Sequence, residues 1–314
     1  MELWNTTWEN SFILIGIFQD SKYPGLLCAT ITFLFLVAVI SNGLLILLIT
    51  MDKRLHVPMY FFLSQLSLMD LLITNVISPK TVVDYLSGQN TISFSGCGIQ
   101  MFLELLVGSS EDILLAFMSY DRYVAIRHPL KYMVFMRPKV CWSMVATSWL
   151  VGFMNALVYT IYTMHLPFCK NREIRHLFCE IPALLKLACG DITKYQLMVY
   201  TMGVVLTLIP LSAILASYTL VLIAVFHMPS KQGKQKALLT CSSHLTVVGL
   251  YYGNVVLIYV LPSAYHSPQQ DNIFSVIYTI VTPALNPLIY SLRNKDVLGA
   301  LKNLLGKFPS VPKL

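Results

Sequence analysis

The stretch MSYDRYVAIRHPL, residues 118–130, decides the fold because it places a charged pair at the end of a long apolar run. Asp121 and Arg122 are adjacent in it, and Pro129 ends the helix that the apolar residues predict. A charged pair at the inner edge of a membrane helix costs free energy unless it has a role. Arg122 could pair with Asp121 or leave it for another partner, and two alternatives of similar energy are what a two-state latch requires.

The composition of the whole chain indicates a membrane protein with several spans. Of its 314 residues, 56% are hydrophobic and 12% are charged, whereas a soluble domain has about 25% charged residues. The net charge of +7 does not indicate nucleic-acid binding, because the basic residues lie in short gaps between apolar runs. Residues 1–22 lack a basic segment followed by an apolar one, so we expect no cleavable signal peptide.

Seven apolar segments are long enough to cross a bilayer, which takes about 20 residues in a helix. Barrel strands would instead show polar and apolar residues alternating over about ten residues. The chain is therefore predicted to be all-α, a seven-transmembrane helix bundle over residues 23–292. The predicted spans are 23–51, 56 or 57–79, 98–126, 140–162, 195–226, 237–261 and 272–292.

The distribution of lysine and arginine predicts the orientation of the bundle. The loops after the first, third and fifth spans, together with the C-terminal tail, hold the larger basic set, which is typical of the cytoplasmic side. Seven spans then place residues 1–22 outside the cell, as an extracellular tail, and residues 293–314 in the cytoplasm. Asn5 begins the tripeptide Asn-Thr-Thr and is a candidate for N-glycosylation, with a chance tripeptide as the alternative.

The C-terminal tail has an amphipathic pattern, in which lysines separate apolar residues at helical spacing. This predicts a short amphipathic helix on the inner leaflet of the membrane, with a purely soluble tail helix as the alternative. The apolar residues are Val297, Leu301, Leu304, Leu305 and Phe308.

The cysteines agree with this orientation. Cys97, Cys169, Cys179 and Cys189 all fall on the predicted outer side. An even number of cysteines in an oxidising compartment predicts two disulfide bonds, with three possible pairings. All three pairings are compatible with the sequence.

Four acidic residues, Asp70, Glu104, Glu111 and Asp112, lie within predicted spans. A charge at the bilayer centre costs roughly 2.5–3.5 kcal/mol, so each should face the bundle interior. Glu104, Gly108 and Glu111 share one helical stripe. Glu104 lies about 10 Å outward of Glu111 at the helical rise of about 1.5 Å per residue. Acids in membrane spans also mark ion paths, so a carrier or channel is one function class that these acids allow, although no inverted internal repeat is visible.

Several longer strings resemble one receptor family. The stretch at 118–130 resembles the third-helix signature of rhodopsin-like (class A) G-protein-coupled receptors, and in its full length that of the olfactory (odorant) receptors. The resemblance extends over nearly the whole chain, and the longer strings are highly specific. The other matching strings are NG at 42–43, PMYFFLSQLSLMD at 58–70, TCSSHL at 240–245, YYG at 251–253 and PALNPLIYSLRN at 283–294.

The resemblance implies a receptor in the plasma membrane, not an enzyme. Such a receptor binds a small volatile odorant within the helix bundle and activates a heterotrimeric G protein of the stimulatory olfactory type, which raises cyclic AMP. Membrane lipids are its other expected partners. The residues that the resemblance assigns to coupling and switching are Asp121, Arg122, Tyr123, Lys236, His244, Asn286, Pro287 and Tyr290.

The resemblance also implies two disulfide bonds, Cys97 to Cys179 and Cys169 to Cys189. It suggests a sodium ion or a shared proton between Asp70 and Glu111, with a protonated structural pair as the alternative; no other cofactor is expected. Glu104 could pair with a cationic or hydrogen-bond-donating ligand, or with an internal partner such as a tyrosine. The candidate ligand-binding residues, for which packing is the alternative role, are Glu104, Leu105, Gly108, Ser109, Met202, Tyr252, Val255, Tyr259 and Thr279.

Overall fold

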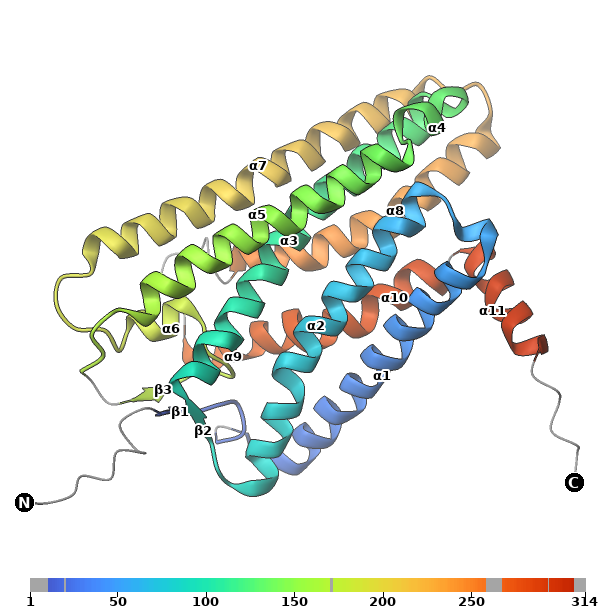
Figure 1. Ribbon diagram of the computed structural model, residues 1–314. Helices are drawn as coiled ribbons and strands as arrows, with labels where there is room; N and C mark the ends of the chain where they lie inside the picture. Colours follow the sequence, from blue (N-terminus) through green and yellow to red (C-terminus); the bar gives the residue numbers. More distant parts are fainter. Residues whose placement is uncertain (1–10, 20, 170–171, 258–266, 293, 308–314) are drawn as a thin grey trace, which may run out of the picture.

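The computed structural model describes residues 11–19, 21–169, 172–257, 267–292 and 294–307, so the candidate glycosylation site Asn5 lies outside the described residues. Long helices run side by side, with a small sheet at one end of the bundle and α11 at the other (Figure 1). The long helices are α1 (Pro24–Met51), α2 (Pro58–Ser87), α3 (Phe94–Arg127), α5 (Pro138–Met164), α7 (Thr193–Phe226) and α8 (Lys231–Val255).

The seventh span is interrupted by a π-helical turn. It consists of α9 (Pro268–Val276), the π turn η5 (Ile277–Val281) and α10 (Thr282–Leu292). The remaining elements are short, apart from the tail helix. They are β1 (Ser11–Leu14), η1 (Lys53–Leu55), β2 (Thr91–Ser93), η2 (Pro129–Lys131), α4 (Tyr132–Phe135), β3 (Glu173–Ile174), α6 (Ile181–Leu185) and α11 (Lys295–Lys307).

The prediction of an all-α bundle of membrane-length helices is confirmed. By length and apolar composition, five described helical segments could cross a membrane: α1, α2, α5, α7 and the seventh span. The other two long helices, α3 and α8, carry more polar residues, and the buried acids of α3 account for its lower hydropathy. The helix α2 continues past the predicted end of its span at Pro79 as far as Ser87, because one proline removes a single backbone hydrogen bond and neighbouring helices support the kink.

The helix α3 lies at the centre of the bundle, where it packs against α2, α5, α7 and α8. Its apolar side chains Leu114, Leu115 and Met118 are almost completely buried. The contact with α5 is close because Gly152 of α5 lies directly against the backbone of α3 at Leu106. Small residues permit such backbone approach between membrane helices, where packing rather than the hydrophobic effect drives association.

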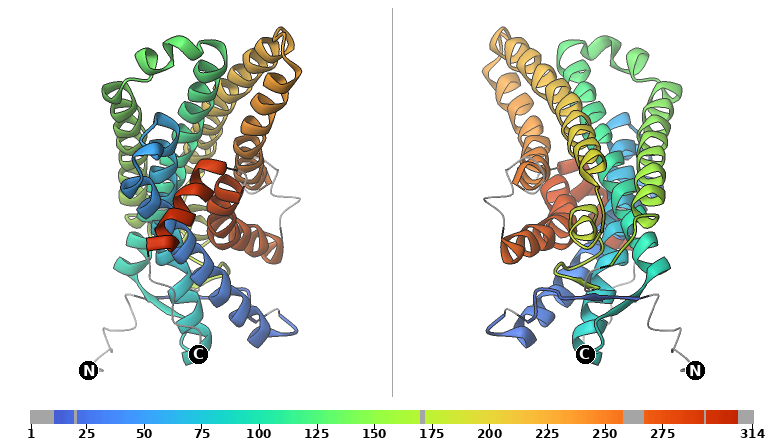
Figure 2. Two further views of the ribbon diagram at one scale, coloured as in Figure 1. Left: turned by 90° about the vertical axis from the view of Figure 1, so that its right-hand side faces the viewer. Right: turned by 90° about the vertical axis from the view of Figure 1, so that its left-hand side faces the viewer.

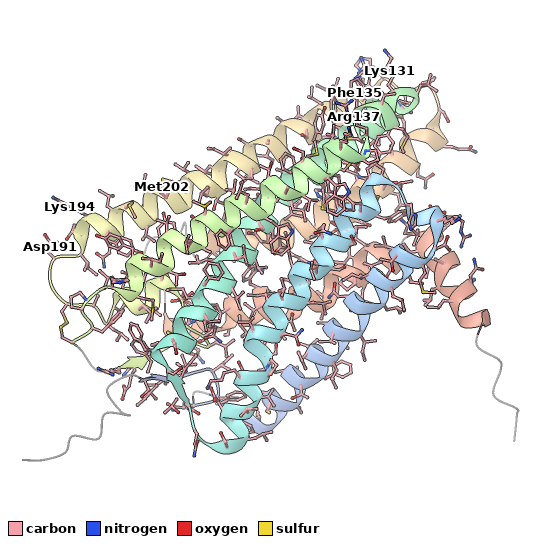
Figure 3. The ribbon with its side chains drawn as sticks, in the orientation of Figure 1. Lys131, Phe135, Arg137, Asp191, Lys194 and Met202 are labelled. Atoms are coloured by element: carbon pink, nitrogen blue, oxygen red, sulfur yellow. A yellow bond between two sulfur atoms is a disulfide. The ribbon has the colours of Figure 1, made fainter. Side chains whose placement is uncertain are left out.

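The two ends of the bundle differ in what they carry. Lys131, Phe135 and Arg137 lie at one end, and Asp191 and Lys194 lie at the other (Figure 3). At the first end, α11 crosses the end of α1 (Figure 2). The predicted tail helix is thus present, but Val297 and Ala300 are buried against the bundle, each with 2% of its surface exposed. Part of its apolar face therefore packs on protein and not on lipid.

At the opposite end, a small sheet and two disulfide bonds hold the loops together. The central strand β1 pairs antiparallel with β2 and parallel with β3. Cys97 at the start of α3 is bonded to Cys179, and Cys169 to Cys189. These are the pairings that the resemblance implies.

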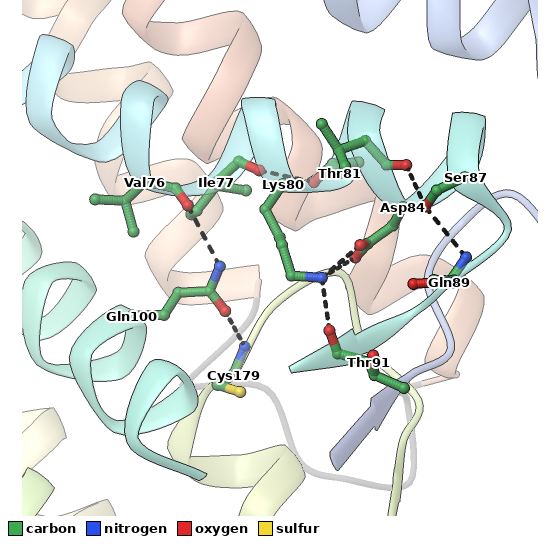
Figure 4. A network of polar contacts seen from close by, with 11 residues as sticks. Val76, Ile77, Lys80, Thr81, Asp84, Ser87, Gln89, Thr91, Gln100 and Cys179 are labelled. Carbon is green, nitrogen blue, oxygen red and sulfur yellow. Dashed lines mark hydrogen bonds and ion pairs between the residues drawn. The ribbon is translucent and has the colours of Figure 1, made fainter. Parts of the chain in front are cut away.

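Gln100 reinforces the disulfide link between α3 and the loop that carries Cys179. Its side-chain oxygen accepts a hydrogen bond from the Cys179 backbone N–H at 3.0 Å, and its amide donates to the Val76 carbonyl at 3.4 Å (Figure 4). Beside it, Lys80 forms an ion pair with Asp84 and donates to the Thr91 carbonyl, which ties α2 to β2. The loop after α5 is therefore fixed to α3, which is itself bonded to α2 through Gln100.

Replacing Gly152 with alanine should destabilise the α3–α5 contact. A Cβ at this position would overlap with Ser110 Oγ and would lie 2.7 Å from the Leu106 carbonyl oxygen, which belongs to the backbone. We expect the free energy of unfolding to fall by about 1–3 kcal/mol, measured as a lower melting temperature of the detergent-purified protein. Gly249→Ala is the control, because nothing lies within 4 Å of its added Cβ. Equal melting temperatures for the two variants would contradict the close contact.

Replacing Gln100 with alanine should loosen the loop. The buried Cys179 N–H would lose its acceptor, which costs about 1–3 kcal/mol, whereas the disulfide would remain. We expect a lower melting temperature and faster proteolysis between residues 172 and 189. The exposed Gln89 supplies the control variant Gln89→Ala. The same change in both variants would show that Gln100 does not secure the loop.

Candidate functional site

The charged pair of α3 is satisfied locally. Arg122 Nη2 donates to Asp121 Oδ2 at 2.8 Å, and the Tyr132 hydroxyl of α4 donates to Asp121 Oδ1 at 2.7 Å. Asp121 is 1% exposed and Arg122 is 7% exposed, so both are removed from water. In this structure Arg122 therefore has the local one of the two partners that the sequence suggests.

A second polar contact joins α7 to α8 at the same end. The Tyr218 hydroxyl and His244 Nδ1 are 2.7 Å apart and share a hydrogen bond, and both side chains are buried. Tyr218 and Tyr132 are absent from the sequence-based set of switch residues. In the sequence, these two tyrosines are marked only by a hydroxyl group within or beside an apolar run, which does not predict a role in switching. Tyr123 packs partly buried against the core, and the side chain of Lys236 lies outside the described residues.

The mid-depth residues of α2, α3 and α10 form a buried polar layer. Asn286 Nδ2 donates to both carboxylate oxygens of Asp70, at 3.2 and 3.1 Å. Tyr290 is also buried, and Pro287 lies within α10 between these two residues. Glu111, 4% exposed, has its Oε1 buried without a hydrogen-bond partner.

The oxygen atoms of this layer are ligands of the kind that a small monovalent cation binds. Besides Glu111 Oε1, the Asn286 Oδ1 atom is buried without a hydrogen-bond partner. Oxygen ligands of this kind suit hard cations. A site for a metal such as zinc is a different case, because no group of three or more His, Cys, Asp or Glu that could hold one occurs among the described residues.

Glu104 lies in the half of α3 that carries Cys97 and is 6% exposed. Four residues further along, the carbonyl of Gly108 accepts a hydrogen bond from the Tyr251 hydroxyl at 2.7 Å. The Tyr278 hydroxyl lies 3.1 Å from where a Gly108 Cβ would be. The absence of a side chain at Gly108 therefore lets tyrosines from α8 and η5 approach α3.

The structure places several of the predicted ligand residues in buried or partly buried positions. The Tyr252 hydroxyl donates to the Asp112 carbonyl at 3.4 Å, and Thr279 of η5 is fully buried and donates to the Ser275 carbonyl. Val255 is buried and Leu105 partly buried. Tyr259 lies outside the described residues.

Two predicted ligand residues do not join this group. Met202 is 43% exposed on α7 (Figure 3), so it lies apart from these buried residues, and its role in ligand binding stays a prediction. The buried residues of α7 form a stripe along the helix, and Met202 lies off that stripe. The stripe includes Tyr195, Thr207, Pro210 and Ile214. Ser109 accepts a hydrogen bond from Asn155 of α5 at 2.8 Å and thus belongs to the α3–α5 contact.

The loop that carries Cys179 forms a polar cover over this region. His176 Nε2 hydrogen-bonds with the Ser275 hydroxyl of α9 at 2.9 Å and lies 3.4 Å from Glu180 Oε1. All three side chains are buried. Sequence analysis did not identify His176 or Glu180, whose only signal was their position beside the bonded Cys179.

Comparisons with known proteins agree with this architecture. The family model described as "Olfactory receptor" matches residues 31–307. The chain is 64% identical to olfactory receptor 2AG1 and 63% identical to olfactory receptor 2AG2, both of Homo sapiens, over 98% of each chain. It is 50% identical to olfactory receptor 2V1 of Mus musculus, over 98% of each chain. These are multi-pass membrane receptors and not enzymes, which confirms the resemblance drawn from the motifs. The chain belongs to the olfactory receptor family.

Proposed function

We propose that this receptor binds a small volatile ligand in the outer half of the bundle and activates a heterotrimeric G protein at the inner end. The proposal rests chiefly on α3, which carries buried polar groups at both ends: Glu104 in the outer half, and Asp121 with Arg122 at the inner end. One helix thus connects a place for a ligand with a charged pair that has alternative partners.

The ligand is proposed to lie beside Glu104, Gly108 and the tyrosines of α8 and η5. Apolar side chains with a few polar groups are typical of sites for small molecules. A buried carboxyl group favours a ligand that is cationic or donates a hydrogen bond, because burying it unpaired is costly. A purely structural role of Glu104 is the alternative, and a response to neutral odorants alone would support it.

The coupling end is proposed to face the cytoplasm, with the N-terminal tail outside the cell and Asn5 glycosylated. Displacement of α8 would break the bond between Tyr218 and His244 and open a groove beside Arg122. Such a groove suits the C-terminal helix of a G-protein α subunit, a helix-in-groove mode of recognition. A G protein of the stimulatory olfactory type would then raise cyclic AMP.

A sodium ion is proposed between Asp70 and Glu111, where it would be shared by the buried oxygen atoms of the polar layer. The unpartnered Glu111 Oε1 supports this proposal. A proton shared between the two carboxyl groups is the competing explanation. Either would hold the middle of α2, α3 and α10 together.

Glu104→Gln should selectively weaken the response to amines. The substitution keeps the shape of the side chain and removes its charge. A hydrogen bond to a charged group contributes about 1.5–3 kcal/mol, so the half-maximal concentration of an amine agonist should rise about 10–100-fold. The measurement is the cyclic-AMP response of cells expressing the receptor to volatile amines and to neutral analogues of matched shape.

Glu173→Gln serves as the matched control, because Glu173 lies in strand β3. Arg122→Ala gives the uncoupled baseline. If Glu104→Gln leaves the response to every amine agonist unchanged, the cation-pairing role fails while the receptor assignment remains.

Asp121→Asn should raise ligand-independent signalling. It removes the charge that holds Arg122 at 2.8 Å, so Arg122 is freed for its other partner. We expect basal cyclic AMP several-fold above that of the unmodified receptor at equal surface expression. Asp191→Asn, which alters an acid at the opposite end (Figure 3), should leave the basal level unchanged. An unchanged basal level in Asp121→Asn cells would contradict the latch.

A further inference from the structure

A groove of about 540 Å³ lies between the end of α1, the turn η1 and the tail helix α11. It is separate from the ligand region and from the charged pair of α3. Its lining combines apolar and basic side chains: α1 supplies apolar residues, η1 supplies basic ones, and α11 supplies both. The apolar residues are Leu48, Met51 and Leu304, and the basic residues are Lys53, Arg54 and Lys302.

The groove carries an excess of positive charge. Asp52 is the acid in its lining, and it holds Arg54 through hydrogen bonds of 2.6 and 3.0 Å. Arg54 is thereby kept in place with its charge largely balanced. The exposed Lys53 and Lys302 extend from η1 and α11 on the two sides of the groove and supply the excess.

The apolar side of the groove continues onto the membrane-facing surface of α1. Met51, the last residue of α1, is 57% exposed. Leu304 packs partly buried against the core and therefore fixes α11 in position. Since α1 crosses the membrane, its end lies at the boundary between acyl chains and headgroups. A ligand that fits there has an apolar part and an anionic part next to each other.

We propose that this groove binds the headgroup of an anionic phospholipid. The lipid phosphate and its acidic substituent would lie between Lys53 and Lys302, and an acyl chain would lie along Met51. Basic residues beside membrane spans attract anionic lipids with about 1 kcal/mol per residue. The bound lipid would bridge η1 and α11, and so hold the tail helix against the bundle. The site also fits the proposed cytoplasmic position of this end, where anionic lipids are concentrated.

The test is a titration of the detergent-purified full chain with short-chain phosphatidylserine, followed by native mass spectrometry, with phosphatidylcholine in parallel. The double variant Lys53→Gln/Lys302→Gln should bind phosphatidylserine about thirtyfold more weakly and phosphatidylcholine as before. In the unmodified chain, the preference for phosphatidylserine over phosphatidylcholine should also fall as the salt concentration rises. The matched control is Lys131→Gln/Lys139→Gln, which removes equal charge from exposed positions at the same end of the bundle. Melting temperatures establish that both variants fold.

Two outcomes would overturn the proposal. One is equal affinity of the two double variants for phosphatidylserine, since that would make attraction a property of the whole basic end. The other is that soluble glycerophosphoserine binds as tightly as the lipid, since the groove would then recognise a phosphate without a membrane. Because the readout is lipid binding, neither outcome depends on the odorant or on G-protein activation.

Discussion

The structure depends on the need to satisfy polar groups in a region without water. A buried backbone or side-chain group that lacks a partner costs several kcal/mol in hydrocarbon, and α3 carries more acids than a membrane helix tolerates without help. In this bundle α3 lies at the centre, where its acids can reach polar partners on other elements. Asp121 obtains two donors, one from Arg122 and one from Tyr132. Asp70 is reached by Asn286 from the seventh span, so one polar layer joins helices that are distant in sequence.

Much of the fold was predictable because membrane insertion leaves a strong pattern in the sequence. Apolar runs bounded by basic loops predicted the helices, and the amphipathic tail predicted α11. The end of α2 was placed too early, because Pro79 was taken as a boundary and the support from neighbouring helices is invisible in one sequence. The position of Asp70 and Glu111 in the bundle interior was predictable from the free-energy cost of a charge in the bilayer alone.

The candidate site was less predictable because it depends on which face of each helix turns inward. Met202 lies in an almost uniformly apolar helix, where the sequence carries little information about the inward face. Tyr218 and His176 reach their partners across long sequence separations, to His244 and to Ser275. Gly152 matters only because α3 approaches it. Such contacts are set by tertiary packing, and local patterns of hydrophobicity do not encode them.

The π turn η5 has a consequence for how the two halves of the seventh span relate. An extra residue in a helix rotates everything beyond it by about 100° relative to a regular α-helix. Ser275 precedes the turn and contacts the loop, whereas Asn286 follows it and contacts Asp70. The turn therefore sets the angle between the half of the seventh span that contacts the loop and the half that contacts Asp70.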